Sequence, residues 1–252
     1  MPHCARFLRM AALAVVCVLA SVTAWAVELH QTGTIEALVA GDYAGLERYA
    51  VLRRHGDFGL GTFTNLDGEM VALDGRFYQV KSDGVAREAS PDQMAPFAQL
   101  VFFTGSLDLG RADGLDLAGL GRALSARLPD PTRFYAVRVD GLFSRVKTRS
   151  APAQARPWPP LATALTRQVV FPLDNVSGTL VGIYSPPAAP GLSVPGWHFH
   201  FLTADRKRGG HVLALRTVAA KARGDQATTM TVVFPKDPTP QGSVPPPVAG
   251  TE

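Results

Sequence analysis

The sequence predicts an α/β protein of the α+β type, with two domains built on mixed, largely antiparallel β-sheets and a few helices. Much of the chain after residue 55 consists of short segments in which apolar and polar residues alternate, as in half-buried strands. Asp-Gly turns separate several of these segments, which is typical of antiparallel meanders. A proline-rich stretch at residues 152–160 is the best boundary between an N-terminal domain at 27–150 and a C-terminal domain at 151–234.

The first 26 residues have the layout of a signal peptide. Arg6 and Arg9 precede an apolar run over residues 10–22, and Ala24-Trp25-Ala26 fits a small-residue cleavage site. We therefore expect export, to the periplasm or outside the cell, with cleavage after Ala26. The apolar run is too short to favour a permanent membrane anchor, so no membrane partner is expected after processing.

Composition argues against disulfide bonds in the mature domain and against nucleic acid as a partner. Both cysteines, Cys4 and Cys17, lie in the leader, so the mature domain must be stable through its core without disulfides. Removing Arg6 and Arg9 from 25 basic residues, against 21 acidic ones, leaves a small positive charge. Nothing in this balance points to nucleic acid.

The N-terminal half begins with one short helix. Thr34 resembles a helix cap, Ile35, Leu38 and Val39 have helical spacing, and Gly41 ends the pattern. Short strands are expected after it, at residues 57–63, 69–73, 76–80 and 97–104. The glycines at 56, 59 and 61 lack the spacing of a nucleotide-binding loop and no helix follows them, so we interpret them as strand and turn glycines.

The remaining elements follow the same rules. Leucines at helical spacing over residues 116–128 predict an amphipathic helix that ends at Pro129. Alternation in residues 133–149 predicts two strands joined by a turn at Asp140-Gly141. A short helix at 161–167 and further strands are expected, followed by an irregular proline-rich tail, with the strands at residues 169–171, 178–184 and 230–234 and the tail at 235–252.

A histidine-bearing β-hairpin at residues 196–213 dominates the functional reading. His198 and His200 lie two residues apart on one strand, so both side chains project from the same face. If the chain reverses between Asp205 and Arg206, His200 pairs directly with His211 on the second strand. Three neutral imidazoles without a cysteine or carboxylate suit zinc and leave positions open for substrate or water. The alternative is that these are ordinary surface or core histidines.

Several blocks of sequence together resemble α-acetolactate decarboxylase. They keep one order across roughly residues 30 to 218 and are far more specific than the histidine spacing. The blocks are Arg54–Phe63, Asn65–Val71, Leu73–Gln79, Val137–Phe143, Ser177–Gly182, Val194–Leu202 and Gly209–Val212. The resemblance implies a two-domain α/β protein with a zinc ion in the cleft between the domains, held by His198, His200 and His211.

The resemblance also implies catalytic residues. The family's active-site acid falls on Glu69, its arginine on Arg149, and a threonine near the site on Thr62. A further glutamate comes from the family's C-terminal tail and falls here on Glu252, the only glutamate of a tail that departs from the family by its prolines. Taken alone, Glu69 reads as a solvated loop charge and Arg149 as a salt-bridge partner.

The implied reaction is decarboxylation of (S)-2-acetolactate to (R)-acetoin and CO₂ through a zinc-stabilised enediolate, as in acetoin and butanediol formation. A Lewis acid would stabilise the electrons left by CO₂, Arg149 would orient the carboxylate, and Glu69 would protonate one face of the carbon. A zinc hydrolase and a non-catalytic exported metal-binding module remain as alternatives, although the chain lacks a His-Glu-x-x-His helix and a Gly-x-Ser-x-Gly elbow. Homodimerisation is possible.

Overall fold

The computed structural model describes residues 27–235. The predicted signal peptide, its cleavage site and Glu252 lie outside the described residues. Within that range, none of the helices has the length and apolar character needed to cross a bilayer.

One large sheet of 11 strands organises the fold. Six strands come from the first part of the chain: β1 (Val27–Thr32), β3 (Phe58–Thr62), β4 (Glu69–Leu73), β5 (Arg76–Val80), β6 (Ala86–Glu88) and β8 (Ala98–Val101). Five follow: β9 (Leu107–Arg111), β10 (Tyr135–Ser150), β11 (Val169–Ser185), β12 (Gly196–Thr203) and β13 (Gly209–Val233). Two further strands pair only with each other: β2 (Glu47–Arg48) and β7 (Met94–Ala95).

The order along the sheet is β10-β11-β12-β13-β1-β8-β3-β4-β5-β6, with β9 beside β13. All these pairings are antiparallel except that of β1 with the end of β13, which is parallel. The predicted class, a mixed and largely antiparallel sheet protein with few helices, is confirmed.

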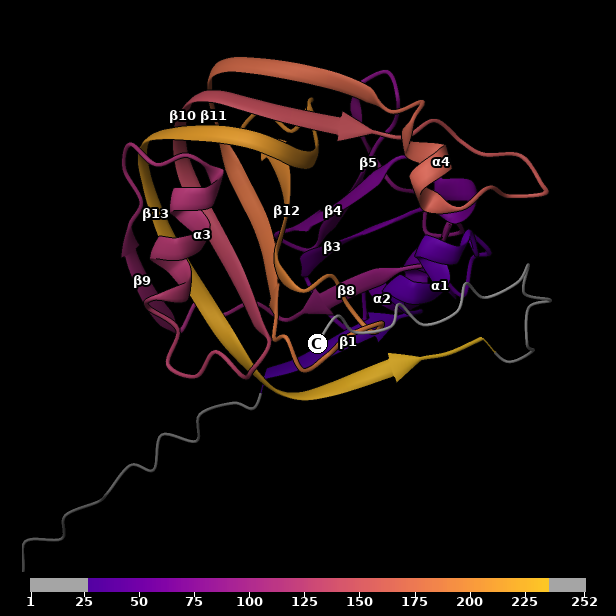
Figure 1. Cartoon of the computed structure of the whole chain (residues 1–252), viewed down its shortest axis with the longest axis horizontal. Helices are drawn as coiled ribbons and strands as arrows, with labels where there is room; N and C mark the ends of the chain where they lie inside the picture. Colours follow the sequence, from indigo (N-terminus) through magenta and orange to yellow (C-terminus); the bar gives the residue numbers. More distant parts are fainter. Residues whose placement is uncertain (1–26, 236–252) are drawn as a thin grey trace, which may run out of the picture.

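Strand β13 links the two halves of the sheet. It begins beside β12 and β10, and its last residues pair with β1, from Val27 opposite Ala227 onward. Figure 1 shows the long strands β10, β11 and β13 curving over the top of the molecule while β13 runs on to β1. This bend brings the two halves face to face, where Leu60 and Val71 share a buried core with Val181 and Leu202.

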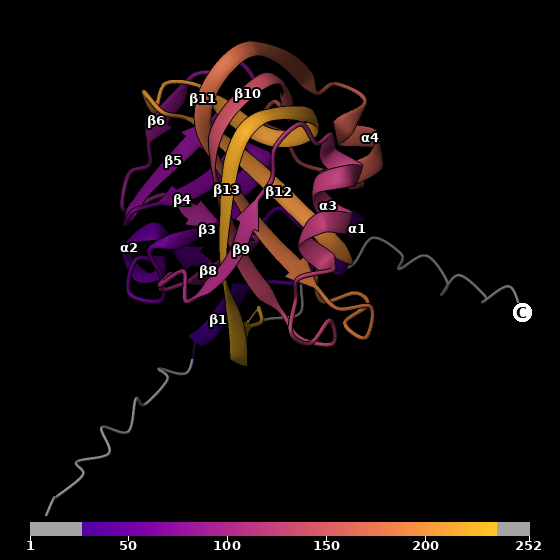
Figure 2. The ribbon, with the colours of Figure 1, turned by 90° about the vertical axis from the view of Figure 1, so that its left-hand side faces the viewer.

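Side-chain caps define the helices that the sequence predicts. Helix α1 (Ile35–Ala40) follows Thr34, whose hydroxyl oxygen accepts a hydrogen bond from the Ala37 N–H, and ends at Gly41 with φ 98°. Helix α3 (Leu117–Ser125) follows a similar cap at Asp116 and packs beside the long strands (Figure 2). The other helical segments are α2 (Tyr49–Leu52), η1 (Thr64–Leu66) and α4 (Leu161–Leu165).

The predicted turn at Asp140-Gly141 is wrong, because β10 runs through both residues as one strand. Gly141 lies directly against β13, and a Cβ atom there would overlap the carbonyl oxygen of Ala219. The glycine is needed for close packing of two strands rather than for a reversal. The two strands predicted on either side of residue 175 are likewise one, β11, and residues 230–233 continue β13. Strand β10, which precedes the predicted domain boundary, pairs with β11 and β13, which follow it.

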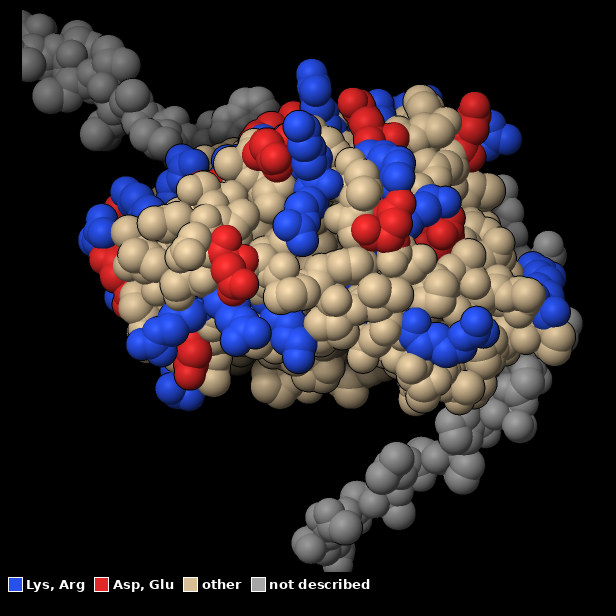
Figure 3. All heavy atoms as spheres, turned by 90° about the horizontal axis from the view of Figure 1, so that it is seen from above, with Lys and Arg blue, Asp and Glu red and all other residues tan. Residues whose placement is uncertain are grey.

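The surface carries charges of both signs. On the face shown in Figure 3, basic and acidic side chains are interspersed among uncharged ones, without one continuous basic area. This distribution gives no electrostatic indication of nucleic-acid binding on that face.

Candidate metal centre

The histidine hairpin has the register predicted from the sequence. His200 of β12 pairs with His211 of β13, and Phe201 and Leu202 pair with the two glycines that precede His211. On its other edge, β13 pairs with β10, which places Arg149 opposite His211. Directly opposed residues on one sheet have neighbouring side chains. Three adjacent strands therefore align His200, His211 and Arg149 in one row.

The three imidazoles converge. One nitrogen from each of His198, His200 and His211 lies within 4.8 Å of those of the other two. The Nε2 atom of His198 is 3.1 Å from the Nδ1 atom of His211. The rings are inclined to one another by 52° to 84°, so they do not stack. Inclined rings with close nitrogens can direct their lone pairs at one point.

Strand β4 supplies the other side of the cluster. The Nδ1 atom of His200 is 2.7 Å from the carbonyl oxygen of Met70, so Nδ1 carries the proton and donates. The remaining ring nitrogen, Nε2, lies 3.4 Å from a carboxylate oxygen of Glu69. The other oxygen of Glu69 lies 3.6 Å from the Arg149 guanidinium. A carboxyl group, a guanidinium cation and an imidazole thus meet in one largely buried group.

Burial sets the protonation of this group. It lowers the pKa of His198 to about 4 and the pKa values of His200 and His211 well below the usual range, and the Arg149 charge acts in the same direction. Burial raises the pKa of Glu69 to about 7, although the nearby charge of Arg149 opposes this rise. All three imidazoles are neutral at pH 7, which is the form that binds metals.

The donor set fits a divalent cation. Two buried ring nitrogens of this cluster, Nδ1 of His198 and Nε2 of His200, have no hydrogen-bond partner within the part of the chain that the structure describes. A buried polar atom without a partner is costly, and a bound ion would satisfy Nε2 of His200, whose other nitrogen is fixed by Met70. Three nitrogen ligands with an oxygen donor nearby suit zinc and leave room for substrate.

A second histidine group, formed by His30, Glu47 and His55, differs in geometry. Its ligand atoms are also within 4.8 Å of one another. The His30 and His55 rings, however, stack at 4.0 Å with only 9° between their planes. Lone pairs in two nearly parallel planes do not converge on one ion, and Glu47 already accepts hydrogen bonds from Thr32 and pairs with His30. This arrangement fits a structural role for His55.

The predicted catalytic residues are brought together to different degrees. Glu69 and Arg149 lie at the histidines, as described above. Thr62 pairs with Glu69 across β3 and β4, but its hydroxyl donates to the carbonyl oxygen of Gly68. Thr62 therefore holds the turn before Glu69, and Glu252 lies outside the described residues. The sequence reading missed the carbonyl of Met70, since a backbone partner leaves no residue-type signal.

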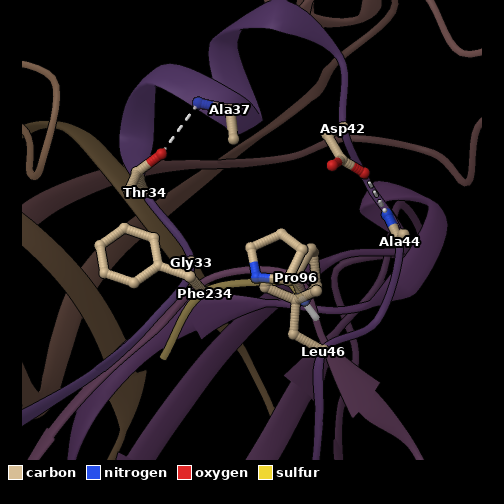
Figure 4. Close-up of a pocket in the computed structure, with 9 residues that line it drawn as sticks. Gly33, Thr34, Ala37, Asp42, Ala44, Leu46, Pro96 and Phe234 are labelled. Atoms are coloured by element: carbon tan, nitrogen blue, oxygen red, sulfur yellow. Dashed lines mark hydrogen bonds between the residues drawn. The ribbon is translucent and has the colours of Figure 1, made fainter. Parts of the chain in front are cut away.

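A cavity of about 350 Å³ opens beside His198 and His211 and extends to helix α3. A second hollow, near α1, is far smaller. It has about 30 Å³, roughly the space of one water molecule, and lies between Gly33, Leu46, Pro96 and Phe234 (Figure 4). Only the larger cavity adjoins the histidines, so it is the candidate substrate site of the two.

Fold and site together place three histidines that could hold a metal ion beside a buried carboxylate and a partly buried guanidinium. The alpha-acetolactate decarboxylase profile matches residues 29–241. The chain belongs to the alpha-acetolactate decarboxylase family, and is an enzyme of the carboxy-lyase class.

Individual relatives agree with this assignment. The chain is 45% identical to an alpha-acetolactate decarboxylase of Methanosarcina mazei over 206 residues, which is 82% of this chain and 70% of the relative. It is 37% identical to that of Bacillus subtilis, over 73% of this chain and 72% of the relative. The crystal structure of alpha-acetolactate decarboxylase from Bacillus subtilis superposes with a TM-score of 0.81 at 34% identity, covering 83% and 90% of the two chains.

Proposed function

We propose that this protein decarboxylates (S)-2-acetolactate to (R)-acetoin and CO₂ with a zinc ion held by His198, His200 and His211. The convergence of three neutral imidazoles beside Glu69 and Arg149 is the observation that carries the proposal. Family membership supports the reaction, because the relatives are named for it.

A cation held by these imidazoles supplies Lewis acidity to the electron pair that departure of CO₂ leaves on the substrate. The protein's part is to keep the three nitrogens neutral and aimed together. Met70 contributes by fixing His200 in the tautomer whose Nε2 is free.

Arg149 binds and orients the substrate carboxylate. Its guanidinium is permanently charged, its side chain is only 13% exposed, and it can donate two parallel hydrogen bonds to one carboxylate. The carbon–carbon bond to this carboxylate breaks, its electron pair passes toward the adjacent ketone, and CO₂ leaves. The positive charge of Arg149 holds the substrate carboxylate in the position from which this carbon–carbon bond breaks.

Glu69 delivers the proton that replaces CO₂. It lies against both His200 and Arg149, so it faces the reacting carbon from one fixed direction. Protonation from one side yields a single enantiomer. The carboxylate then regains a proton from water, which closes the proton balance.

The test is to assay the purified protein for acetoin formed from racemic 2-acetolactate, before and after chelation and after zinc is restored. We expect turnover, loss with the chelator, recovery with zinc, and consumption of one substrate enantiomer first. Tight zinc binding without acetoin formation would contradict the proposal and would favour a non-catalytic metal-binding module.

We also propose that the enzyme acts after export, for acetoin formation from acetolactate outside the cytoplasm. The proposal is supported by the leader-like residues 1–26 and by the family match, which begins only at residue 29. N-terminal sequencing of the protein recovered from the producing cells tests it. A mature chain that begins near Val27 is expected, and an intact leader on cytoplasmic protein would contradict export.

A further inference from the structure

The cavity beside the metal centre has one polar edge and an apolar wall. His198 and His211 form the polar edge. The wall is formed by apolar residues and a glycine from α3, from the loop before β12, and from the two hairpin strands: Leu117, Ala118, Gly121, Val194, Trp197, Phe199 and Val212. Glu69 and Arg149 do not line this cavity. Glu69 lies beside His200, and Arg149 approaches from β10. The charged side chains of Glu69 and Arg149 and the apolar wall of the cavity therefore lie on different sides of the histidine cluster.

The apolar wall is fixed in place by Trp197. Its indole N–H donates to the hydroxyl of Ser125, at the end of α3, over 2.9 Å. Its ring stacks on Phe199 with 5.4 Å between centroids and 6° between planes. A Cβ atom on Gly121 would lie 3.3 Å from the indole, so helix and ring already touch. These contacts hold Trp197 against α3, so this part of the wall sets a steric limit.

We propose that this cavity receives the alkyl substituents of the substrate, and that Ala118 of α3 sets the largest substituent that is accepted. The inference rests on the proposed decarboxylation of a 2-hydroxy-3-keto acid. Such a substrate has one charged end, two oxygens near the metal centre, and alkyl groups with no polar partner. With the carboxylate at Arg149, the alkyl groups turn toward the only apolar surface that the cavity offers.

The volume of the cavity is large enough to bind homologues of 2-acetolactate with longer alkyl groups. At about 350 Å³, the cavity lies within the usual range of small-molecule sites, so the methyl groups of acetolactate leave part of it unfilled. Ala118 is the smallest side chain on the wall, and it is exposed to the cavity rather than packed in the core. A larger residue at 118 removes space without disturbing buried packing.

The experiment compares two homologues with 2-acetolactate, one extended by a methylene at C2 (2-aceto-2-hydroxybutyrate) and one extended on the acyl side. Ala118→Leu is expected to lower the ratio of kcat/KM for at least one homologue over 2-acetolactate by about tenfold or more, the usual effect of a methylene in an apolar pocket. Ala126→Leu is the matched control. It makes the same change at the exposed end of α3, outside the cavity, and should leave both ratios unchanged.

Val194→Ala provides the opposite change, because it widens the wall from the loop side. We expect it to raise the ratio for the homologue that Ala118→Leu rejects. If Ala118→Leu leaves both ratios unchanged in an active protein, the cavity does not select alkyl groups and the inference is wrong. If the unaltered protein forms no acetoin from 2-acetolactate, it is the proposed function that fails.

Discussion

The ring of His200 donates a hydrogen bond from Nδ1 to the backbone carbonyl oxygen of Met70, over 2.7 Å. This contact joins the histidine hairpin to strand β4, one residue after Glu69. It fixes the tautomer of His200, because a carbonyl oxygen can only accept, and it leaves Nε2 with a free lone pair. The contact between β12 and β4 thus sets the position of His200 relative to Glu69.

Loss of a histidine from the centre should remove the metal. We expect His200→Ala to lose most of the bound zinc and to lower activity by more than about 100-fold. Loss of a residue that only hydrogen-bonds to a metal ligand already costs up to about 100-fold, and loss of a ligand should cost more. Metal analysis of the purified variant and the acetoin assay measure the two effects. His55→Ala is the control, since that ring stacks on His30 instead. Full zinc content in His200→Ala would contradict the assigned centre.

Glu69→Gln keeps the shape of the side chain but removes the transferable proton. We expect kcat to fall by about 10²- to 10⁴-fold, the usual contribution of a general acid, with zinc content unchanged. The residual acetoin should also lose enantiomeric purity, because water would then protonate either face. Glu88→Gln, on exposed strand β6, makes the same change away from the site and should be silent. Unchanged kcat in Glu69→Gln would exclude this role.

Arg149→Lys tests the forked contact with the carboxylate. Lysine keeps the charge but makes a point contact, so we expect a loss of about 2 kcal/mol, or roughly 30-fold in kcat/KM. Arg145→Lys lies on the same strand with an exposed side chain and serves as the control. Equal kinetics of the two variants would show that Arg149 is only structural.

Local sequence was sufficient for the histidine hairpin, because its register depends on a short turn. Pairing of His200 with His211 follows from the position of the reversal and was confirmed. Arg149 lies 62 positions before His211, and Glu69 lies 131 positions before His200. Their approach to the hairpin depends on how distant strands pair. Spacing could not reveal that approach, so the residues had to be taken from the family resemblance.

Non-local pairing also explains what the sequence reading missed. No strand was predicted at residues 27–32, and β1 is a strand because β13 and β8 flank it on both sides. Gly141 suggested a turn, since a strand glycine and a turn glycine look alike until the neighbouring strand is known. Both errors arise where a residue's role is set by a partner far along the chain.

Gly141→Ala tests that interpretation of β10. A methyl group there would overlap the backbone of β13 at Ala219, so we expect destabilisation by about 2 kcal/mol or more. Denaturant unfolding of the zinc-loaded protein measures it. An unchanged unfolding midpoint would contradict the close packing.

Asp225 stabilises the connection that follows β8. Its buried carboxylate accepts hydrogen bonds from the backbone N–H groups of Thr104, Gly105 and Ser106, and from the hydroxyl groups of Thr104 and Ser106. Burial alone would raise its pKa, but these hydrogen bonds outweigh burial and hold the pKa below its usual value. The charged form therefore contributes to the stability of the fold.

This contribution should depend on pH in a defined direction. Because the pKa of Asp225 is lower in the folded protein than in the unfolded chain, its contribution is complete above the unfolded pKa of about 3.9 and is lost as pH falls through the folded value. Asp225→Asn should cost about 3 kcal/mol at pH 7, because an amide accepts fewer of these hydrogen bonds. Unfolding of both proteins between pH 7 and pH 3 measures the difference in free energy, which should narrow below about pH 4. A difference that stays constant or widens as pH falls would mean that the charge of Asp225 does not stabilise the fold.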